Sequence, residues 1–118
     1  RSTQGYSSAA SDVYKRQATG KLIKISELDM GIDDESGNSV RTKDATFEQL
    51  KKQSDYYTYI IKSYFKYIPA PQRYGITQWA STDSPDNSSW RPAAPIGLWN
   101  SEYYRKPAYG GFADGLSK

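Results

Sequence analysis

Two short apolar segments and one long amphipathic segment predict a strand, a helix and a second strand in this chain. Residues 22–28 and 74–80 have the length and the apolar, β-branched or aromatic content of strands. Between them, seven residues recur at alternating steps of three and four, which is the spacing of one helical face: Phe47, Leu50, Ser54, Tyr57, Ile61, Tyr64 and Ile68. A strand, a crossover helix and a further strand form a βαβ unit, so we expect the α/β class with parallel strands.

Local signals set both ends of the predicted helix. Thr46 with Gln49 is the pattern of a capping box, in which each side chain satisfies a free backbone amide at the helix start. Prolines from Pro69 onward disfavour continuation, so we expect a helix over 46–67. The polar residues 31–43 are expected to form a loop. Its acids lack the alternating spacing of a calcium-binding loop, which favours a solvated turn.

Acidic residues appear where the first predicted strand ends. Side chains alternate along a strand, and this predicts one face that passes from apolar residues to carboxylates: Ile23, Ile25, Glu27 and Asp29. Burying a lone carboxylate is costly, so such acids are usually solvated, paired or functional. From this segment alone, a strand end that emerges into water explains the pattern as well as a functional site does.

Composition narrows the chemistry. The chain of 118 residues has neither cysteine nor histidine, which excludes disulfides, thiolate sites, the usual zinc ligands and a Ser-His triad. Carboxylates, lysines, tyrosines or hydroxyls must therefore carry any reaction, and no metal site or cofactor is indicated. The net charge of +3 comes without a basic run, and no apolar stretch approaches a membrane span, so neither a nucleic-acid partner nor a membrane partner is indicated.

Residues 1–17 differ from the rest of the chain. They lack sustained periodicity, and they do not have the charged head and apolar centre of a signal peptide. The segment resembles the adapter-derived tails that appear when short sequencing reads are translated. We expect it to be foreign to the fold and disordered or loosely attached, with a natural linker rich in serine and alanine as the alternative.

Several ordered motifs resemble the C-terminal quarter of a family-10 glycoside hydrolase. These enzymes are mostly endo-1,4-β-xylanases built on a (β/α)8 TIM barrel. The resemblance covers residues 18–118 and rests on Ile25-Ser26-Glu27-Leu28-Asp29, residues 74–79, Asp83, Ser89-Trp90-Arg91, residues 95–98 and Lys106-Pro107-Ala108-Tyr109. It implies that the two predicted strands are barrel strands seven and eight, that 108–116 starts or forms the closing helix, and that the N-terminal part of the barrel is missing here.

The same resemblance assigns roles to the two acids. Active sites of TIM barrels lie at the carboxyl ends of the strands, and retaining glycosidases use two carboxyl groups about 5–5.5 Å apart. In the Ser-Glu-Leu-Asp motif, Glu27 resembles the nucleophile, and Asp29 resembles the residue that orients a histidine on strand six. Neither that histidine nor the acid/base glutamate of strand four is in this chain. We therefore expect the chain alone to be inactive.

Two tryptophans resemble the walls of the sugar site beside the cleaved bond. Trp79 and Trp90 occupy these positions, with residues 84–88 lengthening the connection between them. Asp83 and Arg91 are expected to brace this connection. Three later aromatic residues are expected to pack the last loop against the barrel: Trp99, Tyr103 and Tyr104.

The resemblance implies xylan or xylo-oligosaccharides as substrate, no cofactor, and a secreted or periplasmic location. A second hypothesis from another class is a non-catalytic carbohydrate-binding or interaction module, in which tryptophans and tyrosines form a sugar platform and Glu27 only forms hydrogen bonds. The βαβ order disfavours it, because such modules are usually β-sandwiches.

Overall fold

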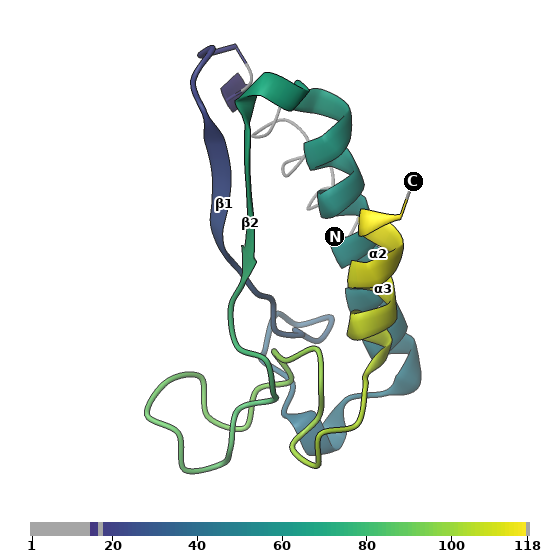
Figure 1. Ribbon diagram of the computed structural model, residues 1–118. Helices are drawn as coiled ribbons and strands as arrows, with labels where there is room; N and C mark the ends of the chain where they lie inside the picture. Colours follow the sequence, from purple (N-terminus) through teal and green to yellow (C-terminus); the bar gives the residue numbers. More distant parts are fainter. Residues whose placement is uncertain (1–14, 17, 118) are drawn as a thin grey trace.

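A computed structural model describes residues 15–16 and 18–117 of the chain (Figure 1). Its main elements are β1 (Ile23–Leu28), α2 (Phe47–Tyr67), β2 (Arg73–Gln78) and α3 (Pro107–Leu116), with short 3₁₀ turns at Thr42–Asp44 and Ala70–Gln72. Of the segment 1–17, only Lys15 and Arg16 belong to the described part, so its foreign origin stays a prediction. Among the described residues, no helix is long and apolar enough to cross a membrane.

The two strands lie side by side and run in parallel, which confirms the predicted βαβ unit. Both point toward the lower end of Figure 1, where the long loops that follow them gather. The ladder is irregular near its end. Ile25 pairs with Ile76 and Leu28 with Gln78, so three steps along β1 match two steps along β2. One extra residue on β1 is therefore accommodated as a bulge.

Helix α2 begins and ends where its local signals predict. The Gln49 amide donates to Thr46 Oγ1 at 3.1 Å, and the Thr46 amide donates to Gln49 Oε1 at 2.9 Å, which completes the capping box. The helix ends at Tyr67, and Ile68 is already extended ahead of Pro69.

Most of the predicted face of α2 is buried against the strands and α3, but its first residue is not. Phe47, in the first turn, is 73 % exposed, whereas the middle and the end of the face form the core. Two buried clusters result, one around Tyr57, Ile61 and Leu28 and the other around Tyr64, Ile68 and Ile23. Tyr64 also ties the strands to the helix, because its hydroxyl donates to Ile23 O at 2.7 Å and accepts from the Gly75 amide at 3.2 Å.

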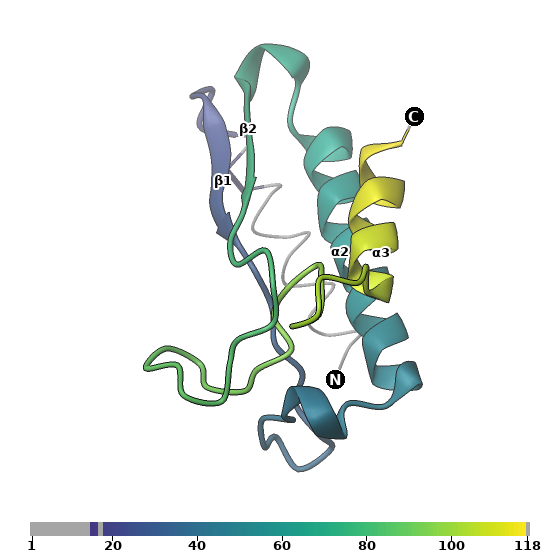
Figure 2. The ribbon, with the colours of Figure 1, turned by 60° about the horizontal axis from the view of Figure 1, so that its bottom comes forward.

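Helix α3 lies directly along α2 in both ribbon views (Figures 1 and 2). The helices come very close at Gly111, where an added Cβ would stand 2.2 Å from Ser54 O. Thr58 Oγ1 donates to Gly111 O at 2.7 Å across the same contact. Only a residue without a side chain lets the two backbones come this close.

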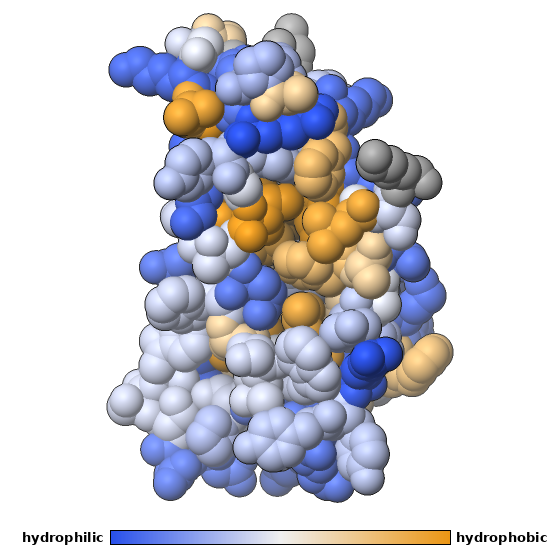
Figure 3. Space-filling model, in the orientation of Figure 1, coloured by the Kyte–Doolittle hydropathy of each residue, from blue (hydrophilic) through white to orange (hydrophobic). Residues whose placement is uncertain are grey.

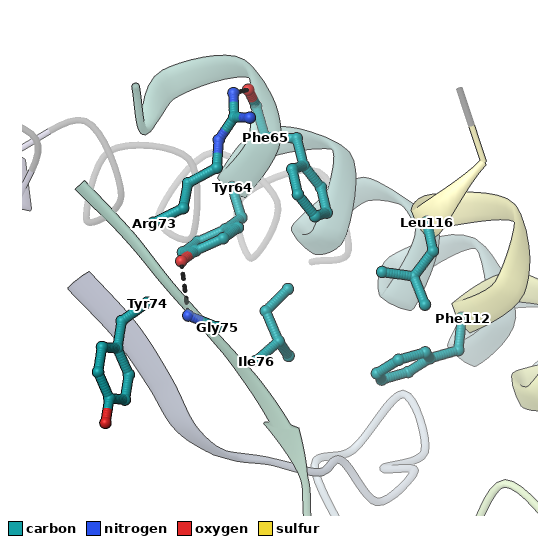
Figure 4. Close-up of a pocket in the computed structure, with 8 residues that line it drawn as sticks. All are labelled: Tyr64, Phe65, Arg73, Tyr74, Gly75, Ile76, Phe112 and Leu116. Atoms are coloured by element: carbon teal, nitrogen blue, oxygen red, sulfur yellow. Dashed lines mark hydrogen bonds between the residues drawn. The ribbon is translucent and has the colours of Figure 1, made fainter. Parts of the chain in front are cut away.

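An apolar groove of about 220 Å³ separates the strand pair from the two helices on one side of the molecule. Figure 3 shows it as an apolar area surrounded by hydrophilic residues. Figure 4 shows side chains from β2, α2 and α3 converging on it. The lining residues are Tyr64, Phe65, Arg73, Tyr74, Gly75, Ile76, Phe112 and Leu116. None of them is a carboxylate, so this groove is separate from the acids at the end of β1.

Candidate active site

The bulge in β1 determines where the first acid points. Simple alternation predicted that Glu27 shares a face with Ile23 and Ile25, and this was wrong. Leu28 instead takes the next core position, only 7 % exposed, while Glu27 is exposed. The extra residue shifts the alternation by one, so Leu28 and not Glu27 packs on α2.

Glu27 lies in a cleft of about 390 Å³ along β1. Residues 23–26 of β1, Arg16 and Tyr64 of α2 line the same cleft, so the carboxylate is accessible to a bound molecule. The arrangement is a solvated acid at the carboxyl end of a parallel strand, which is where α/β proteins place ligand-binding groups.

The second acid is held by an arginine from the loop after β2. Arg91 Nη1 donates to Asp29 Oδ1 at 2.5 Å, and the side chains are 35 % and 18 % exposed. The Arg91 guanidinium also lies 5.6 Å from the centre of the Trp90 ring. Asp29 and Trp90 are thereby joined through one cation, which confirms that Arg91 braces this loop.

Trp79 stands at the end of the other strand. Its backbone amide donates to Leu28 O at 3.0 Å, which places it beside the exit of β1. Trp79 and Trp90 are 46 % and 45 % exposed, so neither is a core residue. No contact between Glu27 and either ring is recorded within the described part of the chain.

Asp83 braces the loop after β2 from inside, as predicted. Its carboxylate is 2.6 Å from Lys106 Nζ, and these two side chains are 1 % and 6 % exposed. Asp83 Oδ1 also accepts from the Gly97 amide, and Lys106 donates to Pro95 O. Burial lowers the pKa of Lys106, and the carboxylate opposes this shift. The motif included Lys106, but nothing in the sequence alone identified it as the partner of Asp83.

Gln53 is a further residue that the sequence analysis missed. Its side-chain amide is buried and donates to Met30 O at 2.9 Å and to Pro95 O at 2.8 Å. It thereby connects the loop after β1 to the loop after β2. The available signal was its place in the sequence, next to Ser54, which belongs to the predicted buried face. A polar side chain buried there requires hydrogen-bond partners, and these could have been sought in the loops.

Tyr57 lies beneath the same region. Burial raises the pKa of its phenol, and the negative charge of Asp29 adds to this shift. The backbone of Met30 opposes the shift, although its geometry falls short of a hydrogen bond to the Tyr57 hydroxyl. The phenol therefore stays neutral and forms part of the core beside the ion pair of Asp29 and Arg91.

The predicted packing of the last loop holds for one of three aromatic residues. Trp99 packs on Tyr109 with ring centres 5.2 Å apart. Tyr103 and Tyr104 are 79 % and 67 % exposed in this chain, whose described residues form only two strands of the expected barrel, so their packing on the barrel stays a prediction. The Asn100 side chain accepts from the amides of Glu102 and Tyr104 and forms a tight turn that leaves both rings in solvent.

The acidic loop after β1 forms a solvated turn, as expected. Asp34 Oδ1 accepts from the amides of Ser36 and Asn38, and the bond from Asn38 is the largest of the effects that lower the pKa of Asp34. In the part of the chain that the structure describes, no group of three or more Asp, Glu, His or Cys residues is placed to hold a metal ion.

Comparison with known proteins gives a consistent family. A sequence model of glycosyl hydrolase family 10 matches residues 2–115, a range that includes most of the predicted foreign leader. The endo-beta-1,4-xylanase Xyn10C of Cellvibrio japonicus is 32 % identical over 117 residues, which cover 82 % of this chain and 18 % of that protein.

Solved structures agree. Native xylanase 10C from Cellvibrio japonicus matches with a TM-score of 0.73 and 27 % identity over 91 % of this chain, and a mutant of that enzyme in complex with xylopentaose matches equally well. An endo-beta-1,4-xylanase from Gloeophyllum trabeum, 20 % identical, has the same fold with a TM-score of 0.67 over 91 % of this chain and 31 % of its own. The chain spans 18 % of the curated relative and 24 % of the native Cellvibrio structure. It belongs to glycosyl hydrolase family 10.

Proposed function

We propose that this chain forms strands seven and eight of a (β/α)8 barrel and supplies the nucleophile side of a retaining endo-1,4-β-xylanase site. The observation that carries the proposal is Glu27, which is exposed next to the carboxyl end of β1 and lines an open cleft along that strand. In barrels of this type, catalytic groups stand at those strand ends.

Glu27 acts as the nucleophile. Its carboxylate attacks the anomeric carbon while the bond from that carbon to the glycosidic oxygen breaks, and a second carboxylic acid gives its proton to the departing oxygen. Water then attacks the glycosyl-enzyme, the Glu27 carboxylate leaves, and the second group takes the proton of that water. The second group comes from strand four by family resemblance.

Asp29 does not contact the reacting carbon and acts through other residues. Arg91 occupies its Oδ1, and no described residue bonds its Oδ2. We assign that oxygen to the histidine of strand six, which in turn orients Glu27. The fixed acceptor holds the imidazole in one tautomer.

Trp79 and Trp90 form the walls of the sugar site. Both rings are half exposed at the strand ends, which suits stacking on the apolar face of a pyranose. Walls this close to the reacting sugar leave little room for a hydroxymethyl group, which favours xylose over glucose. The proposed substrate is therefore xylan, and because a polymer does not enter cells, the proposed location is outside the cell or in the periplasm. The reaction needs no cofactor.

A completed barrel tests the proposal. Residues 18–118 would be joined to the N-terminal part of the Cellvibrio japonicus enzyme, and we call this protein the completed barrel. It should release reducing sugar from xylan with retention of configuration, whereas the 118-residue chain alone should release none above background, because the acid partner of Glu27 is absent.

Substitution of the nucleophile separates catalysis from binding. Glu27→Gln in the completed barrel should lower turnover by several orders of magnitude and leave xylopentaose binding nearly unchanged, since the amide keeps the shape but is a poor nucleophile. Asp29→Asn should have a smaller effect. Near-normal turnover of Glu27→Gln would refute the assignment, and binding without turnover in the unsubstituted barrel would favour a non-catalytic carbohydrate module.

A further inference from the structure

Arg91 connects an acid just past the end of β1 to a tryptophan of the proposed sugar site. It joins Asp29, 62 positions earlier in the chain, to the neighbouring Trp90. The loop that carries Trp90 is also anchored by Thr42, whose amide and hydroxyl donate to Ala93 O, and by its own serines. Ser84 Oγ and Ser88 Oγ both donate to Trp90 O, at 3.1 and 2.7 Å.

The backbone of Arg91 adopts an unusual conformation to make this contact. Its φ is 50°, in the left-handed region that side chains other than glycine rarely occupy. Such a conformation is unfavourable for a residue with a side chain and persists where surrounding contacts hold it. Here the surrounding contacts are the ion pair with Asp29 and the backbone bonds of the turn, in which the Ala94 amide donates to Arg91 O and the Ala93 amide to Pro85 O.

The opposite side of the contact is shaped to admit the guanidinium. A Cβ added at Gly31 would stand 2.7 Å from Arg91 Nη2. Gly31 follows Asp29 by two residues, so the segment that carries the acid also leaves space for its partner. The carboxylate, the space beside it and the left-handed turn thus all favour one position of Arg91.

We infer that Arg91 is a positioning residue that fixes Trp90 against the bound sugar by tying its loop to Asp29. The planar guanidinium suits this role, because it bonds a carboxylate in its plane and packs its face on an indole. This inference rests on the proposed function and adds to it a determinant of affinity for the xylose unit beside Trp90.

Binding measurements in the absence of turnover test the inference. In the completed barrel carrying Glu27→Gln, the dissociation constant for xylopentaose would be measured by calorimetry. Arg91→Met should weaken binding about tenfold, which is within the usual coupling range for groups in one network. Arg91→Lys, which keeps the charge but not the planar fork, should recover only part of the loss. Arg105→Met is the matched control. Like Arg91, Arg105 lies over an aromatic ring, 4.5 Å from the ring centre of Tyr109, but it is outside the proposed site.

A double-mutant cycle identifies the route of the effect. With Asp29→Asn present, Arg91→Met should weaken binding by less than twofold more, because the anchor has already been lost. Fully multiplicative effects of the two substitutions, or unchanged xylopentaose binding by Arg91→Met, would overturn the inference. Either result leaves the assignment of Glu27 intact, since that depends on the turnover of Glu27→Gln. Thermal melts of each variant show whether it is folded, and Arg91→Lys provides the test if Arg91→Met is not.

Discussion

The loop segment 79–106 and the contact between α2 and α3 are held together by different physical means. In the loop segment, a buried ion pair between Asp83 and Lys106 and the buried amide of Gln53 fix the backbone through polar contacts. Between the helices, the fit depends on the absence of a side chain at Gly111. Polar contacts of the first kind specify where a loop lies, and close packing of the second kind specifies how near two helices come.

The largest effect is expected from breaking the buried pair of the loop segment. Lys106→Met leaves the Asp83 carboxylate buried without its cation, so the free energy of unfolding of the completed barrel should fall by about 3–5 kcal/mol. Chemical denaturation measures this change. Lys52→Met is the matched control, because Lys52 is 64 % exposed and 3.8 Å from Glu48, and such a pair contributes at most about 1 kcal/mol. Equal effects of the two substitutions would show that burial of the pair is unimportant.

A smaller effect is expected from the helix contact. Gly111→Ala places a methyl group against the Ser54 carbonyl, so we expect a loss of about 1–3 kcal/mol in the free energy of unfolding. The neighbouring Gly110 offers the control, since an added Cβ meets nothing within 4 Å there. Gly110→Ala should stabilise the helix by about 0.5–1 kcal/mol. If both alanine variants changed the free energy of unfolding by the same amount, the close contact at Gly111 would not require a glycine.

The smallest effect at neutral pH is expected from Tyr57→Phe. Removing a buried hydroxyl without a described partner should change the free energy of unfolding by less than about 1 kcal/mol. Above the ordinary pKa of 10.0, the unfolded phenol ionises while the buried one keeps its proton, so the parent loses stability as the pH rises. Chemical denaturation at neutral pH and above pH 10 should show that Tyr57→Phe loses less free energy of unfolding over this range than the parent does. An equal loss in the two proteins would contradict the raised pKa of Tyr57.

Features encoded by neighbouring residues could be predicted from the sequence. The capping box of Thr46 and Gln49 spans three residues, and the apolar face of α2 follows from helical spacing. The parallel pair followed from the order of the elements. Phe47 was the exception on that face, because the first turn of α2 extends beyond the strands' core.

Features that depend on distant partners could not be predicted. The bulge of β1 exists only relative to β2, about fifty residues later, and simple alternation therefore misplaced Glu27. Gln53 and Lys106 are polar residues whose burial is compensated by carbonyls of Met30 and Pro95, and no local pattern reveals such partners. The candidate residues came from motif resemblance, and their spatial relation came from the fold.

The bulge of β1 also bears on how this segment tolerates changes in length. Deleting Ser26 would leave two steps between Ile25 and Leu28, which matches the two steps between Ile76 and Gln78 on β2. Regular alternation would then keep Leu28 in the core and Glu27 on the opposite face, without a bulge. A regular ladder over the present six residues would instead place the carboxylate on the core face, so the extra residue and the bulge have to be gained or lost together.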